Sequence, residues 1–290
     1  MLKTRIFTAL VLMVGFLAAL FFLPDLYWSL LLLVLILIGL WEWASMAKFS
    51  RYGRWAYVII SLLSGLLFCF SNAPQAIVWK SYSVFWAFFA SAAFWLFLVP
   101  LWLITRYQIK QRSILAVVGW LVLIPLWFAL ICLKSYALLA LVNLQHAAGW
   151  LLLSIIGAVW VADSAAYFVG KRFGKHKLAP LISPGKTWEG VIGAWVAVSI
   201  YGLVLSQLIG LDYALVIWLI GGLWGITVLS IMGDLLESLL KRQASVKDSG
   251  SLLPGHGGVL DRIDGLTSSL PLAAFFIYFP LYYNILESYV

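Results

Sequence analysis

The chain has 290 residues, of which 64% are hydrophobic and only 10% are charged. An average globular protein is about 45–50% apolar and about 25% charged, so this composition excludes a soluble, a disordered or a fibrous protein. It predicts an all-α polytopic membrane protein. The net charge of +8 does not indicate nucleic-acid binding, because the basic residues lie in short clusters between apolar segments, as in proteins oriented in a membrane by positive charge.

Nine apolar segments match the length of about 20 helical residues that a bilayer core of about 30 Å requires. In chain order, the expected transmembrane helices are 6–23, 26–46, 55–71, 84–104, 114–133, 150–170, 188–209, 214–237 and 266–286. With the N-terminus in the cytoplasm, all but two of the 19 Lys and Arg residues lie on the cytoplasmic side, the exceptions being Lys80 and Lys134. This asymmetry predicts a cytoplasmic N-terminus, and an odd number of spans then places the C-terminus outside.

The acidic residues are concentrated in the second half of the chain. Of the 11, all but Asp25 and Glu42 follow residue 150. We therefore expect residues 1–150 to form scaffold transmembrane helices and residues 151–290 to form the catalytic region with its cytoplasmic loops. An intramembrane carboxylate costs about 2.5–3.5 kcal/mol, so acids in apolar spans must face a hydrated or cation-filled cavity or pair singly with Lys or Arg. Four acids have such positions: Asp163, Glu189, Asp234 and Glu237.

The most informative segment runs from residue 233 to residue 265. Polar residues at helical spacings of three, four and seven share one helix face there, namely Asp234, Glu237, Ser238 and Lys241. Asp261 and Asp264 are three residues apart at the start of the last span. Carboxylates from two helix ends that meet at the cytoplasmic surface would form an oxygen-rich site, which suits Mg²⁺.

Between these acidic pairs lies the sequence Pro254-Gly-His-Gly-Gly258, which is not expected to form regular helix. Its glycines permit left-handed backbone and allow backbone N–H groups to approach an anion closely. A helix N-terminus, another anion site, follows. Acidic residues that bind a metal would lie beside basic residues and N–H groups that bind phosphates. This arrangement suits phosphoryl or nucleotidyl transfer. His256 would contact a phosphate or hold the loop, and metal ligation is the weakest option because Mg²⁺ prefers oxygen.

The segment from Ser238 to Asp264 resembles the signature of the CDP-diacylglycerol synthase family (phosphatidate cytidylyltransferases). That signature is Ser-x-apolar-Lys-Arg-x4-Lys-Asp-x-small-x2-apolar-Pro-x-His-Gly-Gly-apolar-x-Asp-Arg-apolar-Asp, and the chain meets it throughout. Residues 163–177 and 183–190 are also similar to the family. The resemblance implies CTP and phosphatidic acid as substrates, and CDP-diacylglycerol and pyrophosphate as products. It also implies a homodimer in the bacterial cytoplasmic (inner) membrane, with the active site on the cytoplasmic side.

The candidate site residues come from these motifs. The expected metal ligands, for Mg²⁺ or Mn²⁺, are Asp234, Asp261, Asp264 and Glu237. The expected catalytic residues are Asp234, Asp261, Asp264, Lys241 and Arg262. The expected substrate-binding residues are Ser183, Lys186, Thr187, Arg242, Lys247, Asp248, His256, Gly257 and Gly258. Pro184 and Gly185 fit a turn, after which Thr187 would cap the next helix so that its first N–H groups meet a phosphate.

Two other functions remain open at this point. A CTP-dependent lipid kinase would transfer the γ-phosphate and release CDP instead of pyrophosphate. A transporter or flippase for an anionic lipid or nucleotide would use the buried acids as a proton or cation pathway and would form no product. Acids clustered at the cytoplasmic surface argue against the transporter, because transporter sites usually lie near the bilayer midplane.

Overall fold

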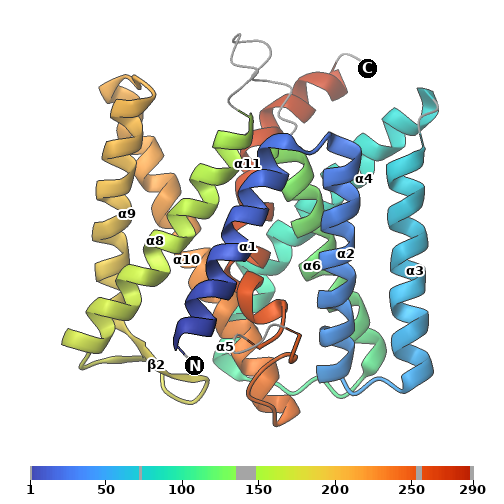
Figure 1. The fold of residues 1–290 in the computed structure, drawn as a ribbon, viewed down its shortest axis with the longest axis horizontal. Coiled ribbons are helices and arrows are strands. Elements are labelled where there is room, and N and C mark those ends of the chain that lie inside the picture. The colour runs from blue at the N-terminus through green and yellow to red at the C-terminus, as the bar shows by residue number, and fades with distance from the viewer. Residues whose placement is uncertain (1, 72–73, 135–147, 253–256, 288–290) are drawn as a thin grey trace.

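The computed structural model describes residues 2–71, 74–134, 148–252 and 257–287. Within these residues the chain is a bundle of helices with one short β-hairpin at one end (Figure 1). The helices are α1 (Leu2–Phe22), α2 (Asp25–Met46), α3 (Arg51–Phe70), α4 (Pro74–Ala93), α5 (Val99–Thr105), α6 (Arg112–Lys134), α8 (Ala148–Phe173), α9 (Trp188–Leu208), α10 (Tyr213–Ala244) and α11 (Leu260–Glu287). A π-helical turn, Phe94–Leu98, joins α4 to α5.

Each expected span coincides with a helix, the fourth with the continuous run from α4 to α5. Seven helices of the described residues are long and apolar enough to cross a membrane, and they correspond to the second to the eighth expected span. The prediction of an all-α polytopic membrane protein is therefore confirmed. The count of nine crossings and the sides on which the two ends lie stay predictions.

The segment between α8 and α9 differs from the expected loop. It forms an antiparallel hairpin of β1 (Lys177–Ala179) and β2 (Ser183–Thr187). The expected turn at Pro184 and Gly185 is wrong, because both lie in the extended strand β2. The chain instead reverses at Pro180, where Ile182 N donates to Ala179 O at 3.1 Å. Each strand of a two-stranded hairpin has a free edge, and a free edge tolerates a proline.

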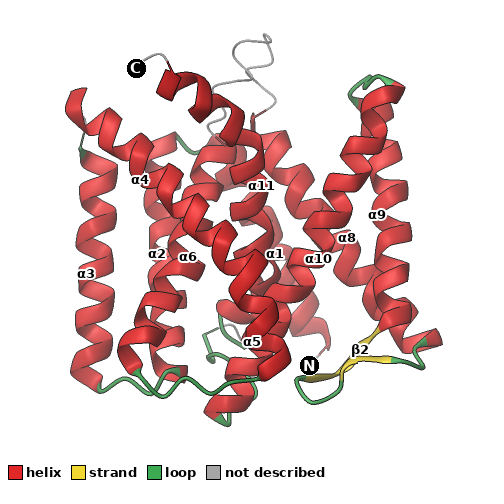
Figure 2. Ribbon diagram, turned by 180° about the vertical axis from the view of Figure 1, so that it is seen from behind, coloured by secondary structure: helices red, strands yellow, loops and turns green. Residues whose placement is uncertain are grey.

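The helix α11 lies at the centre of the bundle. It packs against α10, α6, α4 and α8 (Figure 2). Buried tryptophans join α2 to α6 beside it, since Trp28 Nε1 donates to Leu130 O at 3.2 Å and Trp127 Nε1 donates to Ser29 O at 3.0 Å. These bonds satisfy the indole N–H groups inside the core and fix α2 relative to α6.

The helix α10 is longer than a bilayer core requires. Its 32 residues correspond to about 48 Å of helix, against about 30 Å of hydrocarbon. The apolar part alone predicted an end at residue 237, but the helix continues to Ala244 and stops at Ser245, whose φ is +61°. The extra turns carry polar residues away from the hydrocarbon, and they lie at the end of the bundle where the hairpin lies (Figure 1).

Candidate functional site

Five carboxylates and two lysines gather where α8, α10, α11 and the hairpin meet. Ion pairs and electrostatic interactions join them to one another. We call this group the carboxylate site; it consists of Asp163 of α8, Asp234, Glu237 and Lys241 of α10, Asp261 and Asp264 of α11, and Lys186 of β2. The sequence predicted that the α10 and α11 acids would lie together, and the structure places them on two neighbouring helices.

One half of the site surrounds Lys186. Its Nζ lies 2.6 Å from Asp234 Oδ2. Asp264 interacts electrostatically with Asp234, Asp163 and Lys186, and Asp163 Oδ1 accepts a hydrogen bond from the Ser230 hydroxyl at 3.5 Å. Three aspartates from three helices therefore face a single lysine. When all are ionised, this half of the site has an excess of negative charge.

The other half surrounds Lys241. Its Nζ lies 3.0 Å from Glu237 Oε2 and 2.7 Å from Asp261 Oδ1. The other oxygen of Asp261 accepts hydrogen bonds from Ser249 N at 2.9 Å and Gly258 N at 2.8 Å. Burial raises the pKa of Asp261, but the hydrogen bonds from Lys241, Gly258 and Ser249 outweigh it, so the pKa lies below its usual range. Asp261 is therefore an ionised carboxylate that holds the loop before α11 against the end of α10.

The close contact of α10 and α11 depends on small residues. A Cβ on Gly233 would collide with the backbone carbonyl oxygen of Asp264, and a Cβ on Gly265 would lie 2.6 Å from Ser230 Oγ. Small residues let the backbones of membrane helices approach each other closely. Gly233 thus brings Asp234, its neighbour in sequence, next to the first turns of α11.

The donor set of the carboxylate site fits a hard divalent cation. Glu237 Oε1 is buried and has no hydrogen-bond partner among the residues that the structure describes. Carboxylate oxygens are the ligands that Mg²⁺ prefers, and the negative charge around Lys186 favours a cation. Within the described residues, no three His, Cys, Asp or Glu side chains are close enough together to hold a metal ion. The site thus matches the cation in charge and ligand type, but no three of its acids converge on one point among the described residues.

Thr187 caps α9, as the sequence predicted. Its Oγ1 accepts a hydrogen bond from Gly190 N at 3.2 Å, and the residue is buried. Glu189 in the first turn of α9 does not join the carboxylate site. Its Oε1 lies 2.7 Å from His176 Nδ1, and both of its oxygens accept from His176 N at 3.2 Å, so this acid holds the base of the hairpin.

Several expected substrate-binding residues of the hairpin, the end of α10 and the loop after it do not bond to the carboxylate site. Arg242 Nε lies 3.5 Å from Ile182 O, toward the turn of the hairpin. Lys247 and Asp248 are exposed in the loop after α10, and Ser183 is half-buried at the start of β2. No hydrogen bond or ion pair between described residues joins any of these four side chains to the carboxylate site.

The glycine loop approaches the site with its backbone. Gly257 has φ +81°, a conformation that favours glycine, and a Cβ there would lie 2.5 Å from Asp261 Oδ2. Gly258 donates to the same oxygen. Arg262 is exposed on the first turn of α11. His256 lies outside the described residues.

Two acids that the sequence did not assign to the site contact it or its loop. Asp163 belongs to the Lys186 half, and Glu42 of α2 accepts hydrogen bonds from Val259 N and Leu260 N at the start of α11. The sequence feature that could have identified both acids is the free-energy cost of a carboxylate in an apolar helix. It marked Asp163 as an intramembrane acid, but Glu42 was counted with the scaffold.

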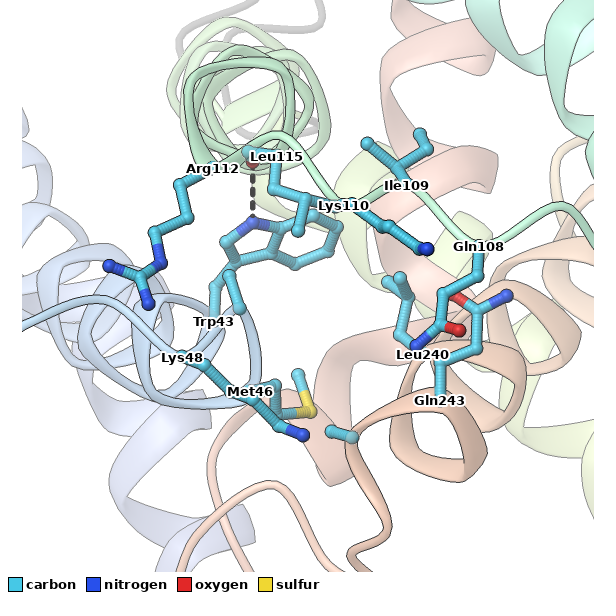
Figure 3. Close-up of a pocket in the computed structure, with 12 residues that line it drawn as sticks. Trp43, Met46, Lys48, Gln108, Ile109, Lys110, Arg112, Leu115, Leu240 and Gln243 are labelled. Atoms are coloured by element: carbon cyan, nitrogen blue, oxygen red, sulfur yellow. Dashed lines mark hydrogen bonds between the residues drawn. The ribbon is translucent and has the colours of Figure 1, made fainter.

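A separate basic cavity of about 220 Å³ lies on a neighbouring face of α10. Lys48, Lys110 and Arg112 line it together with Trp43 (Figure 3). None of its lining residues is acidic, and none belongs to the expected site residues. The cavity is therefore separate from the carboxylate site and lies among basic residues of the segments expected on the cytoplasmic side.

The family model and two of the similar known proteins match this chain over nearly its whole length. The sequence model of the cytidylyltransferase family matches residues 3–280. The chain is 36% identical over 275 residues to the phosphatidate cytidylyltransferase of Pseudomonas aeruginosa, covering 94% of this chain and 96% of that protein. It is 32% identical over 307 residues to the phosphatidate cytidylyltransferase of Haemophilus influenzae, covering 97% and 100%. The phosphatidate cytidylyltransferase of Bacillus subtilis is 48% identical over 127 residues, or 42% of this chain and 44% of that protein. This chain therefore belongs to the cytidylyltransferase family.

Proposed function

We propose that this membrane protein makes CDP-diacylglycerol and pyrophosphate from CTP and phosphatidic acid, a step of phospholipid biosynthesis. Membership of the cytidylyltransferase family and full-length similarity to phosphatidate cytidylyltransferases support it. The observation that carries it in the structure is the meeting of Asp163, Asp234 and Asp264, from three helices, around Lys186. The reaction requires that lipid reaches this site from the bilayer and that nucleotide reaches it from water.

The chemistry is an in-line displacement at the α-phosphorus of CTP. An oxygen of the lipid phosphate forms the new P–O bond, and the bond to the leaving pyrophosphate breaks. This oxygen is already anionic, so the reaction needs no strong general base. The obstacle is the repulsion between two polyanions, and correct placement of both substrates supplies a large part of the catalysis.

The acids and lysines of the site would reduce that repulsion. Mg²⁺ or Mn²⁺, when bound, would neutralise phosphate charge and orient the reacting groups. Asp234, Asp261 and Asp264 would hold the cation once they are drawn together around it, with the buried Glu237 beside them. Lys186 is the cation nearest to Asp234, and its side chain is 22% exposed, so it is placed to exchange this partner for a substrate phosphate.

The remaining candidates would contact the phosphates of the substrates and products. Their backbone N–H groups and side chains would bind the triphosphate, the pyrophosphate and the lipid phosphate. They are Ser183, Thr187, Lys241, Arg242, Lys247, Asp248, His256, Gly257, Gly258 and Arg262.

The protein would lie in the bacterial inner membrane with the carboxylate site on the cytoplasmic side. The distribution of its 19 Lys and Arg residues supports this orientation, and so does the need for CTP, which is a cytosolic nucleotide. We also propose a homodimer. A Cβ placed on Gly221 or Gly225 of α10 would have nothing within 4 Å, and a pair of glycines four residues apart is typical of associating membrane helices.

One assay tests the reaction. Purified protein is mixed with labelled CTP and phosphatidic acid, with and without a divalent cation. Release of pyrophosphate with CDP-diacylglycerol is the expected result, and chelator should stop it. Release of CDP would show a lipid kinase instead. Nucleotide or lipid uptake into vesicles without any product would show a transporter.

A further inference from the structure

Glu42 is a buried acid in the half of the chain expected to be scaffold, yet it bonds to the segment that carries Asp261. Its side chain lies on α2, and the residue is only 5% exposed. Oε1 accepts from Val259 N at 3.0 Å, and Oε2 accepts from Leu260 N at 2.9 Å. Residues more than 200 positions apart are joined by these bonds.

These bonds act as the N-terminal cap of α11. The helix begins at Leu260, and the first N–H groups of a helix have no partner within it. A side chain just before the helix usually supplies the acceptor. Here Glu42 supplies it from another helix, and its negative charge is favourable at the positive end of the helix dipole.

Two glycines of the loop make room for this carboxylate. A Cβ on Gly258 would lie 2.5 Å from both oxygens of Glu42, and a Cβ on Gly250 would collide with Oε1. Any side chain at these positions would push the loop away from α2. At least one glycine of the Gly-His-Gly-Gly sequence is therefore needed for contact with Glu42, independently of any phosphate.

Ser249 extends the contact to the carboxylate site. Its hydroxyl lies 3.0 Å from Glu42 Oε2 and 3.0 Å from Asp261 Oδ2. Its backbone N–H donates to the same oxygen of Asp261. Glu42, Ser249 and Asp261 thus form a continuous polar chain from α2 to the acid that pairs with Lys241.

The framework that holds Glu42 is closely packed. The adjacent Trp43 donates from Nε1 to Leu115 O of α6 at 2.8 Å, the dashed line in Figure 3. A Cβ on Gly119 of α6 would lie 2.6 Å from the Trp43 ring, which shows how closely the two helices pack. The carboxylate of Glu42 therefore belongs to a part of α2 that is packed and hydrogen-bonded against α6.

We propose that Glu42 is a positioning residue for the nucleotidyl transfer. It sets where α11 begins and thereby places Asp261, and Asp264 one turn later, relative to the acids of α10. In this role it acts through α11 and needs no contact with either substrate. This inference rests on the proposed function, because it assigns Glu42 a role in that same reaction.

The test is Glu42→Gln in the full-length protein. Glutamine keeps the size but offers a single oxygen, and its NH₂ group faces an N–H donor. We expect kcat to fall at least tenfold while KM for CTP and for phosphatidic acid changes less than twofold. Asp25→Asn, on the same helix at its opposite end, is the matched control and should keep native kcat. Ser249→Ala should lower kcat by a smaller factor, since both backbone bonds to Glu42 remain.

Hydrogen exchange separates positioning from general stability. Amide exchange at Val259 and Leu260 should be slow in the native protein and at least tenfold faster in Glu42→Gln, with exchange in α6 unchanged. Native kcat in folded Glu42→Gln would overturn the inference, even if its yield or melting temperature were lower. If that variant does not fold, two results together would overturn the inference. They are a native kcat in Ser249→Ala and fast amide exchange at Val259 and Leu260 in the native protein. A native protein that releases no pyrophosphate would instead refute the proposed function.

Discussion

Lys241 joins two buried acids from two helices, and its removal gives the sharpest test of the site. Its Nζ contacts Glu237 of α10 and Asp261 of α11. The side chains of these acids are 7% and 6% exposed, and that of Lys241 is 16% exposed. Lys241→Met keeps the length of the side chain and removes only its charge and donors. Both acids would then be buried without their shared cation.

The expected loss of stability in Lys241→Met follows from the burial of these side chains. Breaking a buried ion pair by removing one partner costs about 3–5 kcal/mol, whereas an exposed pair is worth about 0–1 kcal/mol. About 3–5 kcal/mol is a large part of a typical protein stability of about 5–15 kcal/mol. A loss of 1 kcal/mol lowers the melting temperature of a large domain by about 2–4 °C. We therefore expect Lys241→Met to melt at least about 6 °C below the native protein.

The assay is thermal denaturation in detergent, followed by the fraction of monodisperse protein that remains on size-exclusion chromatography. Lys247→Met is the control, because Lys247 is exposed and such substitutions usually stay within about 0.5 kcal/mol. The double variant Lys241→Met with Glu237→Gln removes one of the two unpaired charges and should recover part of the loss. Lys241→Met that melts with the native protein would refute the reasoning, because the two acids would then not depend on this lysine.

Three further outcomes are expected. Gly233→Ala forces a methyl group against the carbonyl of Asp264 and should cost about 1–3 kcal/mol in thermal denaturation, whereas Gly15→Ala on α1, with nothing within 4 Å, should melt no lower than the native protein. Asp264→Asn should abolish pyrophosphate release in protein that inserts and purifies normally, and near-native turnover would contradict its proposed role. Thr187→Val removes the acceptor for Gly190 N and should cost about 1 kcal/mol, while Thr187→Ser keeps the cap; equal melting of the two variants would count against it.

The sequence alone determined the helices and their approximate limits. A backbone in hydrocarbon must satisfy its own hydrogen bonds, so a long apolar segment has few choices other than a helix. The predicted limits were wrong where a helix continues beyond its apolar residues and where a polar segment forms strands. The helix α10 continues beyond residue 237 because ion pairs such as Glu237–Lys241 stabilise its polar end. The strands β1 and β2 are three and five residues long, too short for any periodicity to show.

Local spacing also determined half of the site. The contacts of Ser238 with Asp234 and of Lys241 with Glu237 are between residues four apart on one helix, which the helical repeat dictates. The signature motif likewise indicated the reaction class. The family model and the full-length relatives agree with it.

Only the tertiary structure decided the partners across helices. Lys186 bonds to Asp234, 48 positions along the chain, and Glu42 bonds to the first amide groups of α11 more than 200 positions away. Such pairs leave no local pattern, because they depend on how closely helices pack and on which residues, such as Gly233 and Gly258, lack a side chain at the contact. Hydrophobicity acts residue by residue and is visible in the sequence, whereas packing is a property of surfaces that exist only after the bundle has assembled.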